Sequence, residues 1–217
     1  SRPLAAAAAA QMMVPRYAHK TALLPDGRVF ITGGLTTETA FLRDTEIYYP
    51  ADASISDGPL LHKARAFHTA TSLQDGTVLL AGGFIAPYST SRTAELYDGR
   101  RFVFLGDRMS DRRELHTATL LQDGTVLICG GFHGGVCSVA SADLYIPGKR
   151  GFMRTGNLND SRYGHTASLL QDGRVLVTGG MEFPGEATLD SVELYYPNTG
   201  TFARAAILAN PVKYHDC

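Results

Sequence analysis

Short apolar runs, each closed by a turn, recur along this chain at a nearly constant spacing. The run HTATLLQDGTVLICGG occupies residues 116–131, and similar runs begin at His19, His68 and His165. The four starting points are separated by 49, 48 and 49 residues. A period near fifty with this many fixed positions predicts a repeat protein.

Each repeat predicts four short β-strands. Strand A is the apolar run after the histidine, and the Asp-Gly pair that follows predicts a tight hairpin, because both residues tolerate positive φ. Strand B is rich in β-branched residues and ends on two glycines, strand C carries an acid-aliphatic-Tyr triplet, and strand D opens at a large apolar residue. One such sheet cannot bury both of its faces, whereas copies packed around an axis can. The pattern therefore predicts an all-β propeller with four complete four-stranded blades.

The residues that recur in every repeat are best interpreted as structural. The arginines and histidines of the Arg-x-x-His motif are Arg16 and His19, Arg65 and His68, Arg113 and His116, Arg162 and His165. The glycine pairs are Gly33-Gly34, Gly82-Gly83, Gly130-Gly131 and Gly179-Gly180, and the strand C acids are Glu46, Glu95, Asp143 and Glu193. We expect each Arg to pair with a strand C acid and each His to hydrogen-bond loop backbone. A metal held by converging histidines is the weaker alternative.

The same register sets the expected boundaries. The repeats cover about 16–64, 65–112, 113–161 and 162–211 within one domain, 1–217. Residues 1–15, which include six alanines at 5–10, match the strand D of a preceding repeat, and residues 212–217 match the start of a following one. We therefore expect a piece of a longer series of repeats.

This pattern resembles the kelch repeat, through Arg-x-x-His, the Asp-Gly turn, the double glycine and the Tyr-then-aromatic spacing over residues 12–215. Phrases such as DGRVLVTGG and DGTVLLAGG are closest to the bacterial kelch-motif style and are similar to the propellers of galactose and glyoxal oxidases. Phe102, Phe152, Phe202 and Ile55 stand where kelch repeats usually place Trp. The resemblance implies a ring of six or seven blades, of which four are present here, and it gives a weak lean toward an extracellular protein.

Candidate function lies where the repeats differ. The loops between strands B and C would share one face with the connections between strands D and A, and loops on a rigid scaffold commonly carry binding residues. The candidate binding residues on that face are Glu38, Phe84, Tyr88, Phe132, His133, Met181, Glu182, Phe183 and Glu186. Aromatic and acidic side chains of this kind suit a protein or glycan partner. The expected function is a non-catalytic binding module without a cofactor.

Three alternatives remain open at this stage. Glu182, Glu186 and Asp190 could form a carboxylate site for a hard cation, but the next position at this spacing is Leu194. The chain could be the propeller portion of a galactose oxidase-like copper radical oxidase, although the necessary residues are not identifiable. It could also be a structural subunit of an extracellular assembly.

Composition excludes few of the candidate functions. The formal net charge of −1 gives no bulk attraction to nucleic acid or anionic membranes. No apolar run reaches the ~18 residues of a membrane span. Cys129, Cys137 and Cys217 cannot form a closed disulfide framework and are interpreted mainly as unpaired thiols.

Overall fold

A computed structural model describes residues 11–86, 89–107 and 109–214 of the chain. Within these residues the protein is all-β, and its only helical segment is a short 3-10 turn, Pro147–Lys149. None of the described residues form a helix with the length and apolarity needed to cross a membrane. The predicted all-β class is confirmed.

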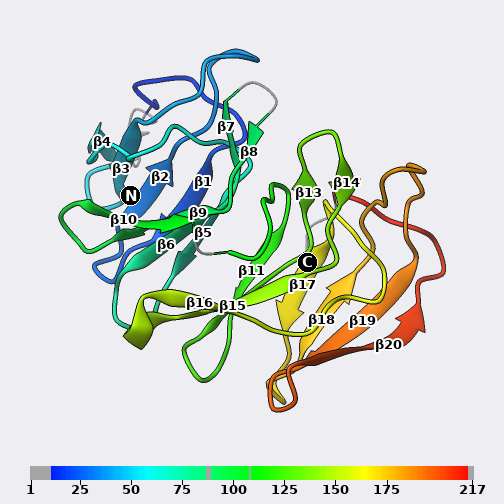
Figure 1. Cartoon of the computed structure of the whole chain (residues 1–217). Coiled ribbons are helices and arrows are strands. Elements are labelled where there is room, and N and C mark those ends of the chain that lie inside the picture. Colours follow the sequence, from blue (N-terminus) through cyan, green and yellow to red (C-terminus); the bar gives the residue numbers. More distant parts are fainter. Residues whose placement is uncertain (1–10, 87–88, 108, 215–217) are drawn as a thin grey trace, which may run out of the picture.

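Four antiparallel sheets, each of four strands, follow one another along the chain (Figure 1). The first contains β1 (Lys20–Leu23), β2 (Val29–Thr32), β3 (Thr45–Tyr49) and β4 (Ser54–Asp57). The second contains β5 (Thr69–Ser72), β6 (Val78–Ala81), β9 (Thr93–Tyr97) and β10 (Phe102–Asp107). The third contains β11 (Thr117–Leu120), β12 (Val126–Cys129), β15 (Ala142–Ile146) and β16 (Gly151–Arg154). The fourth contains β17 (Thr166–Leu169), β18 (Val175–Thr178), β19 (Ser191–Tyr196) and β20 (Thr201–Ile207).

Local chemistry sets the hairpin inside each sheet. In the third sheet Leu120 pairs with Val126, so the chain must reverse over the five residues between them. The Asp123 carboxylate accepts a hydrogen bond from the Thr125 backbone N–H at 2.9 Å, which closes the turn. Asp and Gly occupy the turn because it needs a side-chain acceptor and a backbone that adopts positive φ.

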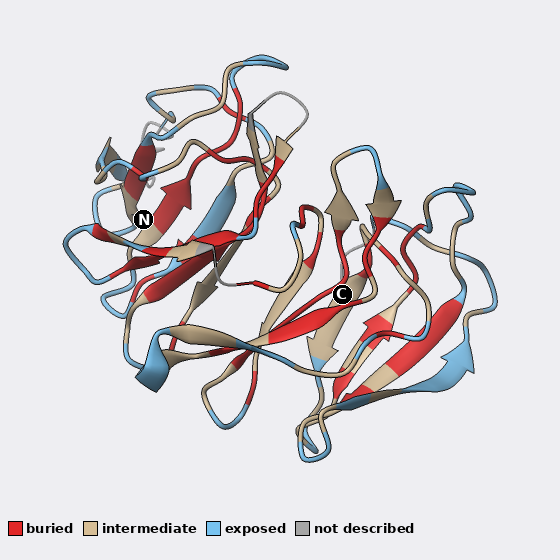
Figure 2. Ribbon diagram, in the orientation of Figure 1, coloured by how far each residue is buried: buried red, intermediate tan, exposed pale blue. Residues whose placement is uncertain are grey.

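Apolar side chains fill the spaces between successive sheets. The first strands, β1, β5, β11 and β17, contact one another in that order, so the sheets fan out from a common inner side. Three core clusters join the first sheet to the second, the second to the third and the third to the fourth. Figure 2 shows the buried residues mainly on the middle strands of the sheets, with exposed residues at the turns and along β20. The arrangement is propeller-like.

The two ends of the described chain carry no strand. Residues 11–15 and 212–214 are irregular. The remainder of the expected strand D, including residues 5–10, and His215 to Cys217 lie outside the described residues.

Candidate functional site

The four predicted Arg–acid pairs are all present and buried. Arg65 approaches Glu95 to 2.7 Å, Arg113 approaches Asp143 to 3.0 Å, and Arg162 approaches Glu193 to 2.8 Å. Arg16 pairs with Glu46 in the same way. The paired side chains are at most 2% exposed. Each carboxylate also accepts backbone N–H bonds from the preceding connection, for example from His62 and Lys63 to Glu95.

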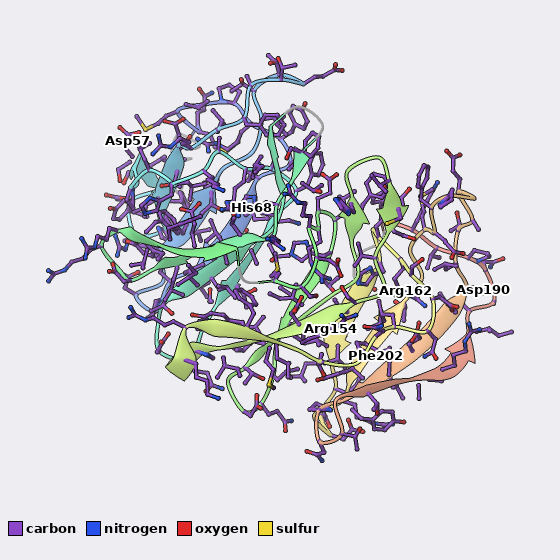
Figure 3. The ribbon with its side chains drawn as sticks, in the orientation of Figure 1. Asp57, His68, Arg154, Arg162, Asp190 and Phe202 are labelled. Carbon is purple, nitrogen blue, oxygen red and sulfur yellow. The ribbon has the colours of Figure 1, made fainter. Side chains whose placement is uncertain are left out.

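Arg65, Arg113 and Arg162 each join two successive sheets. The Arg113 backbone N–H donates to Ser91 and its carbonyl accepts from Gly83, both in the second sheet's loop. Its guanidinium instead donates to the carbonyls of Gly130 at 2.7 Å and Ser141 at 2.9 Å in the third. Arg65 and Arg162 repeat this arrangement. Figure 3 labels Arg162 beside the strands of the fourth sheet.

For His68, His116 and His165 the partner is a threonine hydroxyl and not the expected loop backbone. His116 Nε2 lies 3.1 Å from Thr69 Oγ1 and His165 Nε2 lies 3.0 Å from Thr117 Oγ1, each in the preceding sheet. His68, labelled in Figure 3, contacts Thr32 Oγ1 at 2.9 Å. The imidazoles reach across to hydroxyls because they are inserted between inner strands.

Burial keeps His68 and His116 neutral. Desolvation, and then the charge of the nearby Arg65 or Arg113, lowers the pKa of His68 and His116 well below the usual 6.5. A neutral imidazole next to a hydroxyl suits a structural hydrogen bond. The described residues hold no cluster of three or more His, Cys, Asp or Glu side chains suited to a metal ion.

In the first three pairs, the first glycine makes room for the next repeat. A Cβ on Gly130 would lie 2.5 Å from the His165 ring and 2.7 Å from the Arg162 carbonyl. Gly130 has a φ of +64°, so both space and backbone conformation require glycine. The recurrent residues therefore build the joints between sheets.

The variable loops and the D–A connections meet on one side of the molecule, which we call the loop face. The residue after each motif arginine pairs with the start of the following B–C loop, as in Ala66 with Phe84 and Glu114 with Phe132. Two loops form hairpins, β7 (Phe84–Ala86) with β8 (Ser89–Thr90), and β13 (Phe132–His133) with β14 (Cys137–Ser138). Both hairpins project on the same side in Figure 1.

An aromatic cluster occupies the loop face over the third and fourth repeats. The ring centroid of Phe132 lies 4.9 Å from Tyr163 and 5.5 Å from Phe183, and Tyr163 lies 6.4 Å from Tyr214. Ser138 holds Phe183 in place, because its backbone N–H donates to the Phe183 carbonyl at 3.1 Å and the Phe183 N–H donates to its hydroxyl at 3.2 Å. Phe132, Tyr163 and Phe183 are half-buried, while Tyr214 is 58% exposed.

The Glu114 carboxyl group lies beside this cluster. Glu114 is 7% exposed and forms a backbone bridge with Phe132 of the cluster. Burial raises its pKa to about 7. The pKa of Tyr214 is raised by burial, then by Tyr163 and then by Glu114, so this carboxylate acts on the cluster electrostatically.

Sequence reasoning missed Tyr163, Tyr214 and Glu114. Glu114 and Tyr163 each directly follow a motif arginine. The residues at this position in the four repeats are Tyr17, Ala66, Glu114 and Tyr163. This variation inside Arg-x-x-His was therefore the sequence signal that could have identified them. Tyr214 packs over Gly164, where a Cβ would lie 2.7 Å from its ring. At that position the other repeats have Ala18, Phe67 and Leu115. Gly164 in the fourth repeat was therefore the sequence signal for the Tyr214 ring that packs over it.

The other predicted binding residues are scattered over the loop face. Phe84 contacts Phe41, 5.4 Å away, in a separate pair. Met181 is only 9% exposed and belongs to the core, which corrects its assignment to the surface. Glu38, Glu182 and Glu186 are exposed, and His133 is half-buried. Tyr88 lies outside the described residues. The thiols of Cys129 and Cys137 are both free.

The opposite side of the molecule is hollowed between neighbouring turns. One hollow of about 460 Å³ lies between the Asp123 and Asp172 turns and the turn at Pro197. A smaller one of about 280 Å³ lies between the equivalent turns at Asp75, Asp123 and Pro147. The two hollows lie at equivalent places in successive repeats. They therefore result from the spacing between neighbouring turns and do not mark a site that is particular to one repeat.

Comparison with protein-family models gives no match, and comparison with curated proteins gives none either. Among solved structures, the chain is similar to one described as the structure of YjhT, with a TM-score of 0.77. That similarity covers 92% of this chain and 73% of the other at 12% sequence identity. It supports the all-β, propeller-like fold.

Proposed function

We propose that the four sheets are blades of a kelch-type β-propeller, and that the protein is a non-catalytic binding module. The support for the kelch type is the registered motif, because each of its recurrent residues has one structural role in successive sheets. In this proposal the chain supplies four blades to a larger ring.

The binding site of this module is the aromatic cluster of Phe132, Tyr163, Phe183 and Tyr214 with the Glu114 carboxylate. The observation that carries the proposal is the juxtaposition of half-buried rings with the Glu114 carboxyl group on the loop face.

A glycan matches this chemistry better than a folded protein. Sugar rings present C–H groups that stack on aromatic faces, and their hydroxyls donate to carboxylates. A protein hot spot would need a wider buried patch around its anchors, whereas this cluster consists of four rings.

The test is binding of the purified chain to an array of oligosaccharides, followed by titration calorimetry of the best ligand. Tyr214→Ala removes an exposed ring and should weaken binding about tenfold, in keeping with ~1.4 kcal/mol per decade. Phe104→Ala is the matched control, because Phe104 is 40% exposed on β10 and outside the cluster. Binding of no glycan, or equal loss in both variants, contradicts the proposal. Stoichiometric copper with peroxide production would instead favour an oxidase.

A further inference from the structure

The D–A connections lie side by side where they cross the loop face. The Gly164 N–H donates to the Leu115 carbonyl at 3.0 Å, and the Tyr214 N–H donates to the Gly164 carbonyl at 2.8 Å. Glu114 directly precedes Leu115, and Tyr163 directly precedes Gly164. These hydrogen bonds therefore place the Glu114 carboxyl group of the third repeat next to Tyr163 of the fourth.

The B–C loop of the fourth repeat brings two more carboxylates to the aromatic cluster. Met181 and Tyr163 pair through two backbone hydrogen bonds of 3.0 and 2.9 Å, so this loop begins beside Tyr163. Glu182 is the next residue, and its carboxylate accepts a hydrogen bond from the Ser161 hydroxyl at 3.4 Å. Glu182 and Glu186 are both exposed. A ligand that covers the cluster therefore meets carboxylates from two neighbouring repeats.

The charges that act on the two tyrosines of the cluster are negative. Burial raises the pKa of Tyr163, and the nearby Glu186 carboxylate raises it further. The carboxyl group that acts on Tyr214 is Glu114, after burial and Tyr163, and it also raises the pKa. Lys213 precedes Tyr214 in the sequence but is not among the groups that shift the pKa of either tyrosine. The tyrosine rings therefore lie in the field of carboxylates.

Aromatic rings with carboxylates around them favour a cation. The face of an aromatic ring is negative, so it attracts an ammonium group, and the attraction strengthens when the pair is withdrawn from water. Neighbouring carboxylates attract the same ammonium group directly and accept its hydrogen bonds. They repel a ligand that carries a carboxylate, sulfate or phosphate group. The cluster therefore distinguishes among glycans by their charge.

We propose that the glycan bound at this cluster carries free amino groups, as an oligosaccharide of unacetylated amino sugars does. This inference rests on the proposed glycan-binding function and specifies the class of its ligand. A sugar ring stacks on the exposed Tyr214, and a protonated amine lies toward the carboxylates of Glu182 and Glu186. Acetylation of the amine removes its charge and with it this part of the affinity.

The test compares two ligands of equal length, an oligomer of glucosamine and the same oligomer of N-acetylglucosamine. Titration calorimetry with the 217-residue chain is done in mildly acidic solution, in which the amine is protonated. The amine form should bind about tenfold more tightly. Equal affinities, or tighter binding of the acetylated form, overturn this inference and leave glycan binding intact. Binding of no glycan at all overturns the proposed function and this inference with it.

Substitutions identify the groups that supply the selectivity. Glu186→Gln and, independently, Glu182→Gln should each weaken binding of the amine form about threefold. Binding of the acetylated form should change little, because it has no charge to lose. Glu38→Gln is the matched control, since it removes the same charge from an exposed loop of the first repeat. Circular dichroism establishes that each variant is folded. An equal loss in the control, or no loss in either cluster variant, overturns the inference.

Discussion

At the scale of single residues, the recurrent histidines bond to threonines that occupy different strand positions in different repeats. His116 and His165 use the hydroxyl of the threonine that follows the preceding histidine, Thr69 and Thr117. In the first sheet that position is Lys20, which offers no hydroxyl, and its cross-strand partner Thr32 serves His68 instead. The contact survives because either strand of the hairpin can place a hydroxyl at the same point.

Glu114 provides a prediction on pH dependence. Its pKa rises from 4.5 to about 7 on folding, so the folded protein keeps a proton that the unfolded chain has released. Stability from this group is complete below 4.5 and is lost as the pH rises toward 7. Glu114→Gln should therefore increase the free energy of unfolding by about 1–3 kcal/mol above the folded pKa, with little effect in acid.

Urea denaturation at several pH values measures this difference. Glu38→Gln, a change on an exposed loop residue, should stay within about 0.5 kcal/mol of the unchanged protein throughout. An increase of the same size at every pH would show that the amide acts by packing, against the electrostatic explanation.

At the scale of elements, the end of each strand B is fitted to the following repeat. The first glycine of the pair has the next Arg carbonyl and the next His ring against it. Gly33, Gly82 and Gly130 all follow this rule, with positive φ and a prospective Cβ within 2.7 Å of that carbonyl. A strand that merely ended in a loop would not need glycine at this place.

Gly130→Ala is accordingly expected to destabilise the protein by about 2–4 kcal/mol, through strain at positive φ and displacement of His165. Thermal unfolding followed by circular dichroism would show the loss. Gly148→Ala is the control, because nothing lies within 4 Å of a Cβ there. Equal melting temperatures for the two variants would refute this role of the glycine pair.

At the scale of the whole molecule, the repeat made much of the fold predictable. The four strands of each sheet and the Arg–acid pairs recur together in the sequence, so their contacts could be inferred from recurrence. The aromatic cluster could not, because Phe132, Tyr163 and Tyr214 belong to different repeats and the variation inside Arg-x-x-His does not show which of their side chains meet. Met181 was misplaced for a related reason: it begins a variable loop, yet pairs with Tyr163 and lies in the core.

The Arg113 backbone bonds the second sheet, whereas its guanidinium bonds the third. Loss of this side chain should therefore weaken the contact between the two sheets. Arg113→Ala leaves Asp143 buried without its cation, and breaking such a pair costs about 3–5 kcal/mol. For a chain of this length the melting temperature should fall by roughly 10 °C. Arg112→Ala removes an exposed neighbouring arginine and should change the melting temperature by about 2 °C or less. An unchanged melting temperature in Arg113→Ala would mean that apolar packing alone joins the second sheet to the third.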